Sequence, residues 1–470
     1  MSIGEDSVKL NILVLYDESP IHINYIKEHL ECFSKFMNHN VFYIPATNER
    51  PLNFELDAFD AIIIHFCVRL AYRWHISSKF VKKLKEFKGP KVLIIQDEYD
   101  SPYIACEWIK ELGIEVVFSC VPERFRDYFY PEPKVGHVKF IQNITGYVPY
   151  SPAIKQYYKP MAGRSVVVGY RGRILPFVYG ALGREKYEIG KKMKEICQEC
   201  NIPHDIEWEE EERIYGTRWY EFLSNCRTIL GSESGSNVVD HDGSLRTRID
   251  EQIKEKPNLT FEEIYDKYVK EYDGKVEMNQ IAPKIFEAIA LKTALVLYEG
   301  NYSGIILPDI HYIPLKKDFS NVDIVLQKVK DIGYLESLTE RAYADIIESG
   351  KYGYQVFVKR VEEEIISRVK PQSKKEWIHA IIGYRSQGEE HFLSAPFYPF
   401  NKPVRMDASF FKKITNDLIE NQRAEVISYV KQELIISERL VFMISGMRRI
   451  VPGPITRLLK KTLGIGKERK

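Results

Sequence analysis

Two glycines and two arginines stand directly after a short run of valines near the middle of the sequence. The valines at 166–168 predict a buried strand, and Gly169, Arg171, Gly172 and Arg173 follow it. Glycine lets a backbone approach a ligand closely, and the planar guanidinium of arginine pairs with two phosphate oxygens. Loops at the carboxyl ends of parallel strands are also where open α/β sheets bind ligands. The pattern favours an anion site over an ordinary turn with solvated arginines, although it is not a GxGxxG fingerprint.

A second candidate segment begins at Gln280 and continues into an amphipathic helix. Pro283 suits the first turn of that helix, where free backbone N–H groups can bind a phosphate. Glu287 lies four residues further on, so it shares the same face one turn later. Its carboxylate is therefore predicted to reach a ribose hydroxyl, and the alternative is a solvated glutamate.

A third loop follows the strand predicted at 228–230. Ser234, Gly235, Ser236 and Asn237 stand in this loop, and hydroxyls and backbone amides of this kind suit a phosphate.

Two further patterns raise the question of a metal ion. Asp240 and Asp242 flank a histidine on a loop, and paired carboxylates of this kind can bind Mg²⁺. Cys197 and Cys200 form a CxxC with His204 nearby, but no second pair is present. Short Asp-x-Asp matches arise often by chance, and the cysteines stand at the end of a predicted helix. We therefore predict no metal site.

Apolar runs alternate with helical patterns along most of the chain. The predicted strands are residues 12–15, 41–45, 61–66, 91–96, 115–119 and 139–143, then 165–168, 205–208, 228–230 and 294–298. Helices are predicted between several of them, which indicates crossover units and parallel sheets. The sequence thus predicts an α/β fold of two tandem Rossmann-like domains.

A proline-rich break around 148–160 separates the two halves, which gives domains at 1–150 and 160–370. The stretch at about 246–280 interrupts the second half and contains a capping box, so it is predicted to be an insertion. Residues 371–470 are predicted to be a helical, basic extension. From residue 438 on, nine basic residues face two acidic ones, interleaved with apolar residues. This tail fits either a membrane-surface segment or a solvated tail.

The composition narrows the function classes. The net charge of +1 over 470 residues gives no general basic excess, so nucleic acid is not the expected partner. Seven scattered cysteines fit reduced thiols in a cytoplasmic protein. We find no basic leader and no apolar run of about twenty residues, so neither a signal peptide nor a spanning helix is expected.

The run Phe286-Glu287-Ala288-Ile289-Ala290 resembles the nucleotide-sugar-binding helix of GT-B glycosyltransferases. Residues 305–314 and 338–361 resemble the turn, strand and closing helices that follow it in that family, and the ending is similar to CgeB-like members. The resemblance covers about 165–366. It departs from the pattern at Asn279, where many retaining members carry a glutamate, and at Leu291-Lys292, which replace a pair of small residues.

The resemblance implies a GT-B-like enzyme of hexosyltransferase type that needs no added cofactor. A nucleotide-diphosphate sugar would be the donor, bound to the second domain, with Glu287 on its ribose. The acceptor would be a glycan or a lipid-linked hydroxyl bound to the first domain, as in polysaccharide or glycoconjugate synthesis. The departures leave the stereochemical outcome open.

An inverting reaction would need a general base from the first domain. Asp97 and Glu98 follow a buried strand there and are our candidates, although a turn or cap role is common for such residues. Asp17, Glu18, His22 and His65 are further strand-end candidates. The alternative function is a non-catalytic signalling or scaffold protein with a degenerate nucleotide-sugar fold.

Overall fold

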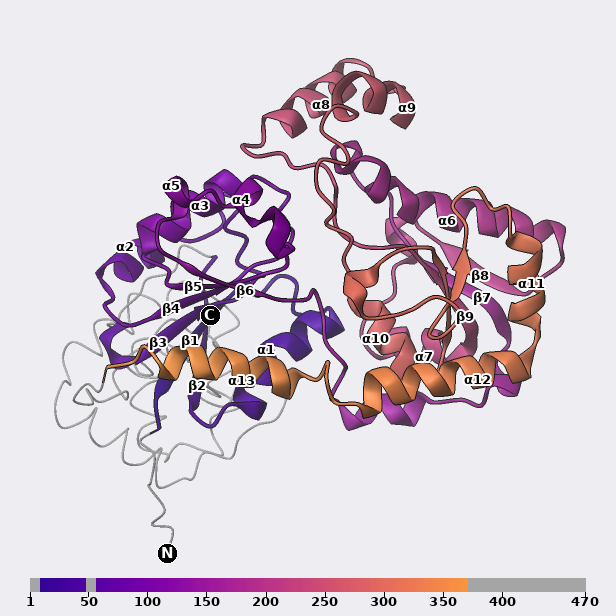
Figure 1. Cartoon of the computed structure of the whole chain (residues 1–470), viewed down its shortest axis with the longest axis horizontal. Coiled ribbons are helices and arrows are strands. Elements are labelled where there is room, and N and C mark those ends of the chain that lie inside the picture. The colour runs from indigo at the N-terminus through magenta and orange to yellow at the C-terminus, as the bar shows by residue number, and fades with distance from the viewer. Residues whose placement is uncertain (1–8, 48–55, 371–470) are drawn as a thin grey trace, which may run out of the picture.

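Six apolar runs of the first domain form one sheet in which every strand pairing is parallel (Figure 1). In the computed structural model, which describes residues 9–47 and 56–370, the strand order is β2-β1-β3-β4-β5-β6. The strands are β1 (Asn11–Tyr16), β2 (Asn40–Pro45), β3 (Ala61–Ile64), β4 (Lys91–Ile94), β5 (Val116–Ser119) and β6 (Lys139–Gln142). The first five are almost wholly buried, as expected of parallel strands covered on both faces.

Helices cover both faces of this first sheet. They are α1 (Asn24–Phe36), α2 (Ser78–Glu86), α3 (Pro102–Leu112), α4 (Arg126–Phe129) and α5 (Glu132–Val135). α2 and α3 pack on one face, and α1 packs on the other.

The second domain repeats the plan with five parallel strands in the order β11-β10-β9-β7-β8. The strands are β7 (Val166–Arg171), β8 (His204–Glu207), β9 (Cys226–Gly231), β10 (Ala294–Tyr298) and β11 (Ile313–Leu315). The helices are α6 (Gly180–Glu199), α7 (Thr217–Asn225), α10 (Pro283–Ala290), α11 (Val322–Lys330) and α12 (Ile332–Ala342). α7 and α10 cover one face, and α6, α11 and α12 cover the other. The prediction of two tandem Rossmann-like domains is confirmed.

The last described helix, α13 (Tyr354–Ile366), returns to the first domain. It packs beside α1, and Tyr354, Phe357 and Val361 join the core under the first sheet. Figure 1 shows it crossing from the second domain to the first. The sequence prediction had placed everything up to residue 370 in the second domain, because an amphipathic helix does not reveal which sheet it covers.

The interruption of the second domain is a small helical unit with its own apolar cluster. It contains α8 (Ser244–Glu255) and α9 (Phe261–Ile264), and the predicted capping box at Thr260 is present. In Figure 1 these helices stand above both sheets.

None of the helices in the described part of the chain is long and apolar enough to cross a membrane. The predicted basic extension at 371–470 lies outside the described residues.

Candidate functional site

A cavity of about 320 Å³ lies beyond the carboxyl ends of β7 and β9. From β7 the chain goes outward to β8 on one side and to β9 on the other, so β7 and β9 flank the point where the strand order reverses. Open α/β sheets bind their ligands in this crevice. The remaining walls come from α6, the loop before α7, α7 itself, α10 and the start of α1, so both domains contribute.

Five basic side chains line this cavity, which we call the cation cavity. They are Arg171, Arg173, Lys186, Arg213 and Lys284, and Glu287 is the only acid among the described lining residues. Arg171 pairs with Asp205 and Arg213 with Glu210. No carboxylate within the described ranges pairs with the other three basic side chains. The cavity therefore carries an excess of positive charge, which an anion would neutralise.

The surroundings of Lys186 and Lys284 disfavour the charged form of both side chains. Burial, reinforced by the charge of Arg173, lowers the pKa of Lys186 to about 8. Burial, reinforced by Lys186, lowers the pKa of Lys284 to about 7. The Lys284 Nζ also lies 4.6 Å from the centre of the Tyr170 ring. A bound anion would restore the favourable environment that both ammonium groups lack.

The two arginines at the end of β7 differ in their contacts. Arg171, the last residue of the strand, is hydrogen-bonded, whereas Arg173 has no ion-pair partner among the described residues. The Arg171 guanidinium donates to the Glu212 carbonyl at 3.0 Å and lies 4.5 Å from the centre of the Phe222 ring. Arg173 is exposed at the rim. Gly172 lines the cavity, whereas Gly169 lies inside β7, where a Cβ atom would meet the Cys226 sulfur at 2.3 Å.

The start of α10 faces the cavity as predicted. Pro283 occupies the first turn, and Glu287 lies one turn further in. The Trp219 Nε1–H donates to Glu287 Oε2 at 2.7 Å. Burial raises the pKa of Glu287 to about 7, and the bond from Trp219 opposes that rise. Its second oxygen has no recorded hydrogen bond among the described residues, so a ligand hydroxyl can bind there.

Of the serine-rich loop after β9, Ser234 lines the cavity. Its Oγ accepts from Lys186 Nζ at 3.0 Å, and its backbone pairs with that of Gln280. Gly235, Ser236 and Asn237 instead shape the loop. Gly235 has a φ of +102° against the Met278 carbonyl, which an added Cβ would strike.

The side chains of Ser236, Asn237 and Gln280 form hydrogen bonds with backbone groups. Ser236 Oγ donates to the Tyr179 and Val238 carbonyls, and Asn237 Oδ1 accepts from the Met278 N–H. Gln280 Nε2 donates to the Cys120 carbonyl at 3.0 Å, which ties the second domain to the first.

The two predicted catalytic acids point in different directions. Asp97 is exposed, has a left-handed φ of 54° and accepts from the Tyr99 hydroxyl at 2.8 Å. It does not line the cation cavity, although its charge raises the pKa of Lys186. Glu98 is 1% exposed and accepts from Ser119, from the Tyr130 hydroxyl at 2.8 Å and from the Cys120 N–H at 2.8 Å. Burial raises the pKa of Glu98 to about 7. Neither acid lines the cation cavity, and of the two only Asp97 is exposed.

The residues weighed as metal ligands have structural contacts. Asp240 accepts from the backbone N–H groups of Gly243, Leu245 and Arg246 at the start of α8. Asp242 accepts from the Ser244 N–H. Cys197 is buried, Cys200 is exposed, and within residues 9–47 and 56–370 no three His, Cys, Asp or Glu side chains gather as a metal site.

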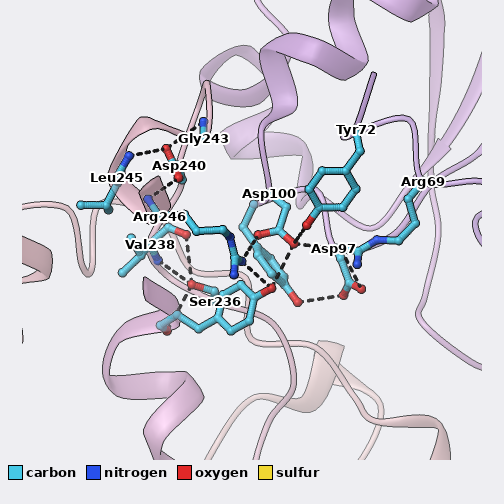
Figure 2. A network of polar contacts seen from close by, with 12 residues as sticks. Arg69, Tyr72, Asp97, Asp100, Ser236, Val238, Asp240, Gly243, Leu245 and Arg246 are labelled. Atoms are coloured by element: carbon cyan, nitrogen blue, oxygen red, sulfur yellow. Dashed lines mark hydrogen bonds and ion pairs between the residues drawn. The ribbon is translucent and has the colours of Figure 1, made fainter. Parts of the chain in front are cut away.

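A polar network joins the two domains (Figure 2). Asp100, which is 4% exposed, accepts from Arg69 at 2.8 Å and from Arg246 at 2.9 Å. The hydroxyls of Tyr72 and Tyr179 also donate to it. Arg246 belongs to α8, so the helical insertion is bound directly to the first domain.

Sequence reasoning missed Lys186, Lys284 and Trp219. Lys186 lies within α6 and Trp219 within α7, and no motif in the sequence marks either residue as part of a site. Lys284 directly follows Pro283, so the argument for an anion at that helix start could have included it.

No protein-family model matches the chain, and no characterised protein sequence matches it. Among solved structures, it is similar to an α-glucosyltransferase in complex with UDP and a mismatched DNA 13-mer, at 11% identity and a TM-score of 0.48, over 77% of this chain and 100% of that one. The Anabaena protein HepE in complex with UDP is 12% identical, with a TM-score of 0.40 over 77% and 100%.

Sucrose-phosphate synthase from Thermosynechococcus elongatus is 11% identical, with a TM-score of 0.39 over 76% of this chain and 99% of that one. Likenesses at these levels define neither a site nor a substrate. The structure defines a protein of two Rossmann-like domains, with a cavity that is lined by five basic side chains and to which both domains contribute.

Proposed function

We propose that this chain is a GT-B-like glycosyltransferase that transfers a sugar from a nucleoside-diphosphate donor to a hydroxyl group. The observation that carries the proposal is the convergence of Arg173, Lys186 and Lys284, without carboxylate partners in the described structure, on the start of α10. Glu287 lies one turn beyond, where it fits a ribose hydroxyl. Cations and a helix start match a diphosphate, and the carboxylate matches a nucleoside.

The chemistry follows from these positions. The bond between the sugar's anomeric carbon and the diphosphate oxygen breaks, and a bond from the acceptor oxygen forms. Negative charge grows on the departing diphosphate, so the cations bind it more tightly in the transition state than in the donor. The acceptor proton needs a base if the reaction inverts, and Asp97 is our candidate because it lies near Lys186. Glu98 has no comparable access.

Calorimetric titration with UDP, ADP and GDP tests the site. Arg173→Ala and Lys284→Ala each remove a charged donor, which should weaken binding of the preferred diphosphate by about tenfold to a hundredfold. Lys191→Ala is the matched control, since Lys191 is exposed on α6 and outside the cavity lining. Equal affinity of all variants for every diphosphate would refute the assignment.

Turnover separates the transferase from the scaffold alternative. A panel of nucleotide sugars should include one that the wild-type protein hydrolyses slowly, since water replaces the acceptor. Tight diphosphate binding without hydrolysis or transfer of any donor would favour the scaffold.

The proposed setting is polysaccharide or glycoconjugate synthesis, with a glycan or lipid-linked acceptor. Vesicles containing anionic lipid should retain the full chain and release a chain that lacks residues 438–470. Equal behaviour of the two chains would remove the membrane contact from the proposal.

A further inference from the structure

The amine of Lys284 lies in the cation cavity without a polar partner. Lys284 follows Pro283 at the start of α10 and lines the cavity. Among the described residues no hydrogen bond or ion pair reaches its Nζ atom, whose recorded contact is the face of the Tyr170 ring at 4.6 Å. The face of a phenol ring attracts a cation only weakly. The charged form of this side chain therefore has little to stabilise it until a ligand enters.

Lys186, the other lysine of the cavity, is bonded, and its charge acts on Lys284. The Lys186 Nζ donates to Ser234 Oγ at 3.0 Å. Burial, reinforced by the charge of Lys186, lowers the pKa of Lys284 to about 7. At pH 7 about half of the Lys284 amines are therefore neutral, against roughly one in two thousand for an exposed lysine.

A neutral amine is a nucleophile, and lysine is the basic residue of this cavity that can become one. Arginine keeps its charge, so Arg173 can bind an anion but cannot attack a carbon atom. Burial beside a second cation activates a lysine for imine formation with a carbonyl group. Lys284 meets both conditions, because it is buried and Lys186 supplies the second cation.

The surroundings of the amine select which carbonyl compound can reach it. Arg173 has no ion-pair partner among the described residues, and the start of α10 offers backbone N–H groups to an anion. Together with Lys186 they suit a phosphate group on the incoming molecule. Binding through that phosphate would hold the carbonyl carbon beside the amine, so the two react within one complex rather than by encounter in solution. An aldehyde that carries a phosphate therefore matches this cavity better than a neutral aldehyde.

We propose that Lys284 is a covalent modification site, whose amine forms an imine with phosphate-bearing aldehydes that enter the cation cavity. Open-chain sugar phosphates belong to this chemical class. The amine nitrogen attacks the carbonyl carbon and gives a carbinolamine, which loses one water molecule as the carbon–nitrogen double bond forms. Lys186, with a pKa of about 8, is mostly protonated at pH 7 and can give a proton to the departing hydroxyl group, and the nitrogen releases one in turn. The step needs no oxidant or reductant, and hydrolysis reverses it.

The imine would occupy the region that we assign to the diphosphate of the donor. A phosphate-bearing aldehyde would then block the donor until the imine is hydrolysed, which makes the modification a reversible inhibition. This consequence rests on the proposed function, whereas the imine itself rests on the cavity and its lysines.

Imine trapping on the full chain tests the site. The probes are glyceraldehyde 3-phosphate and glyceraldehyde, which differ by the phosphate group, with sodium cyanoborohydride to reduce the imine at pH 7. Mass spectrometry of peptides then gives the rate at which each lysine is modified. Lys284 should react at least about tenfold faster with the phosphorylated probe than with glyceraldehyde. It should also react at least about tenfold faster than Lys191, which is exposed on α6 and outside the cavity lining. Lack of either preference would overturn the proposal.

Two variants give a matched comparison. Lys284→Arg keeps the positive charge and removes the nucleophile, so the fast adduct should disappear. Lys191→Arg makes the same change at an exposed lysine and should keep the fast adduct. Thermal melting shows whether each variant is folded, and the peptide map of the wild-type protein decides the question if Lys284→Arg is not. A folded Lys284→Arg protein that still forms the fast adduct would refute the assignment.

The pH dependence of the rate separates the Lys284 amine from an exposed one. Between pH 7 and pH 9 the neutral fraction of an exposed lysine rises about a hundredfold, whereas that of Lys284 rises about twofold. The rates of modification should follow these fractions. A hundredfold rise in the rate at Lys284 would show an ordinary amine and contradict the proposal.

Competition with UDP keeps this proposal separate from the proposed function. Saturating UDP should slow the modification of Lys284, because both ligands need the same cations. Fast modification that UDP does not slow would support the imine site and refute the assignment of the diphosphate to this cavity. Absence of the adduct in a protein that binds UDP would overturn the imine site and leave the diphosphate assignment in place.

Discussion

Glu287 is an acid whose burial works against its ionised form. Its pKa is raised to about 7, so between the ordinary value and pH 7 the folded protein holds a proton that the unfolded chain releases. Stability should therefore fall as the pH rises through that window, and the full cost remains above it. A costly carboxylate at the start of a cavity is typical of a functional site rather than of a packing residue.

Replacing Glu287 by glutamine removes this cost and keeps an oxygen that can accept from Trp219. At pH 8 the free energy of unfolding should rise by up to about 3 kcal/mol, with little change near pH 4. The affinity of the variant for nucleoside diphosphates should fall, because a carboxylate binds ribose hydroxyls better than an amide does. Urea titrations at the two pH values and calorimetry with UDP measure both effects.

Glu28→Gln is the control for this pair of effects. Burial, reinforced by the charge of Glu287, raises the pKa of Glu28 to about 8, but the Glu28 side chain does not line the cation cavity. It should gain stability at pH 8 without a change in nucleotide affinity. A loss of stability in Glu287→Gln at pH 8 would contradict the expected sign.

Some of the residues that line the cation cavity could be predicted from the sequence, and others could not. Arg173, Pro283 and Glu287 were predicted because a strand end and a helix start give them a defined place. Trp219 was not, because its bond to Glu287 joins residues 68 positions apart. Glu98 was predicted with Asp97, yet the two side chains diverge. Sequence places a strand end but does not determine which way each side chain of the following turn points.

At the scale of elements, the pairing of β7 with β9 depends on a glycine. Gly169 lies on β7 opposite Ile229, with Cys226 and Phe222 packed over its α-carbon. The glycine was predicted to allow close approach of a ligand. It instead allows close approach of a neighbouring strand and helix, which is the other common reason for glycine inside a sheet.

Gly169→Ala should therefore lower the free energy of unfolding by about 1–3 kcal/mol through overpacking. The double variant Gly169→Ala, Cys226→Ala should recover part of the loss, because the sulfur is the nearest obstacle at 2.3 Å. Gly163→Ala, where an added Cβ meets nothing within 4 Å, is the control. Urea unfolding midpoints give the comparison, and equal stability of the two single variants would contradict the packing described for β7.

The strands were predictable from sequence because parallel strands buried on both faces require continuous apolar runs. The sequence prediction assigned the residues of α13 to the second domain because they follow it in the chain, but the helix packs on the first sheet. Its apolar face would fit either sheet. The bridge between Asp100 and Asp240 was also beyond prediction, because it joins two loops whose residues carry no periodic signal.

For the whole molecule, this bridge and the side chains around Asp100 determine how the domains are held. Ser101 N–H donates to the Asp240 carbonyl, and Asp240 N–H donates to the Tyr99 carbonyl. Asp100 adds ion pairs to Arg69 within its own domain and to Arg246 across the gap (Figure 2). The cation cavity needs walls from the two domains, so its shape depends on how the domains are held.

Removing Arg246 should loosen the domains without unfolding either. Arg246→Ala leaves Asp100 paired with Arg69, so the stability cost should be about 1–3 kcal/mol rather than that of an unpaired buried charge. In small-angle X-ray scattering the variant should have a larger radius of gyration than the wild-type protein. Saturating UDP should bring the two values together, because residues of both domains line the cavity in which we propose that it binds. Arg248 lies two residues further along α8, and within the described residues its side chain bonds only to Tyr272. The Arg248→Ala variant should scatter like the wild-type protein. Identical scattering of all three proteins without UDP would show that contacts other than those of Arg246 hold the domains together, such as the bond from Gln280 to the Cys120 carbonyl.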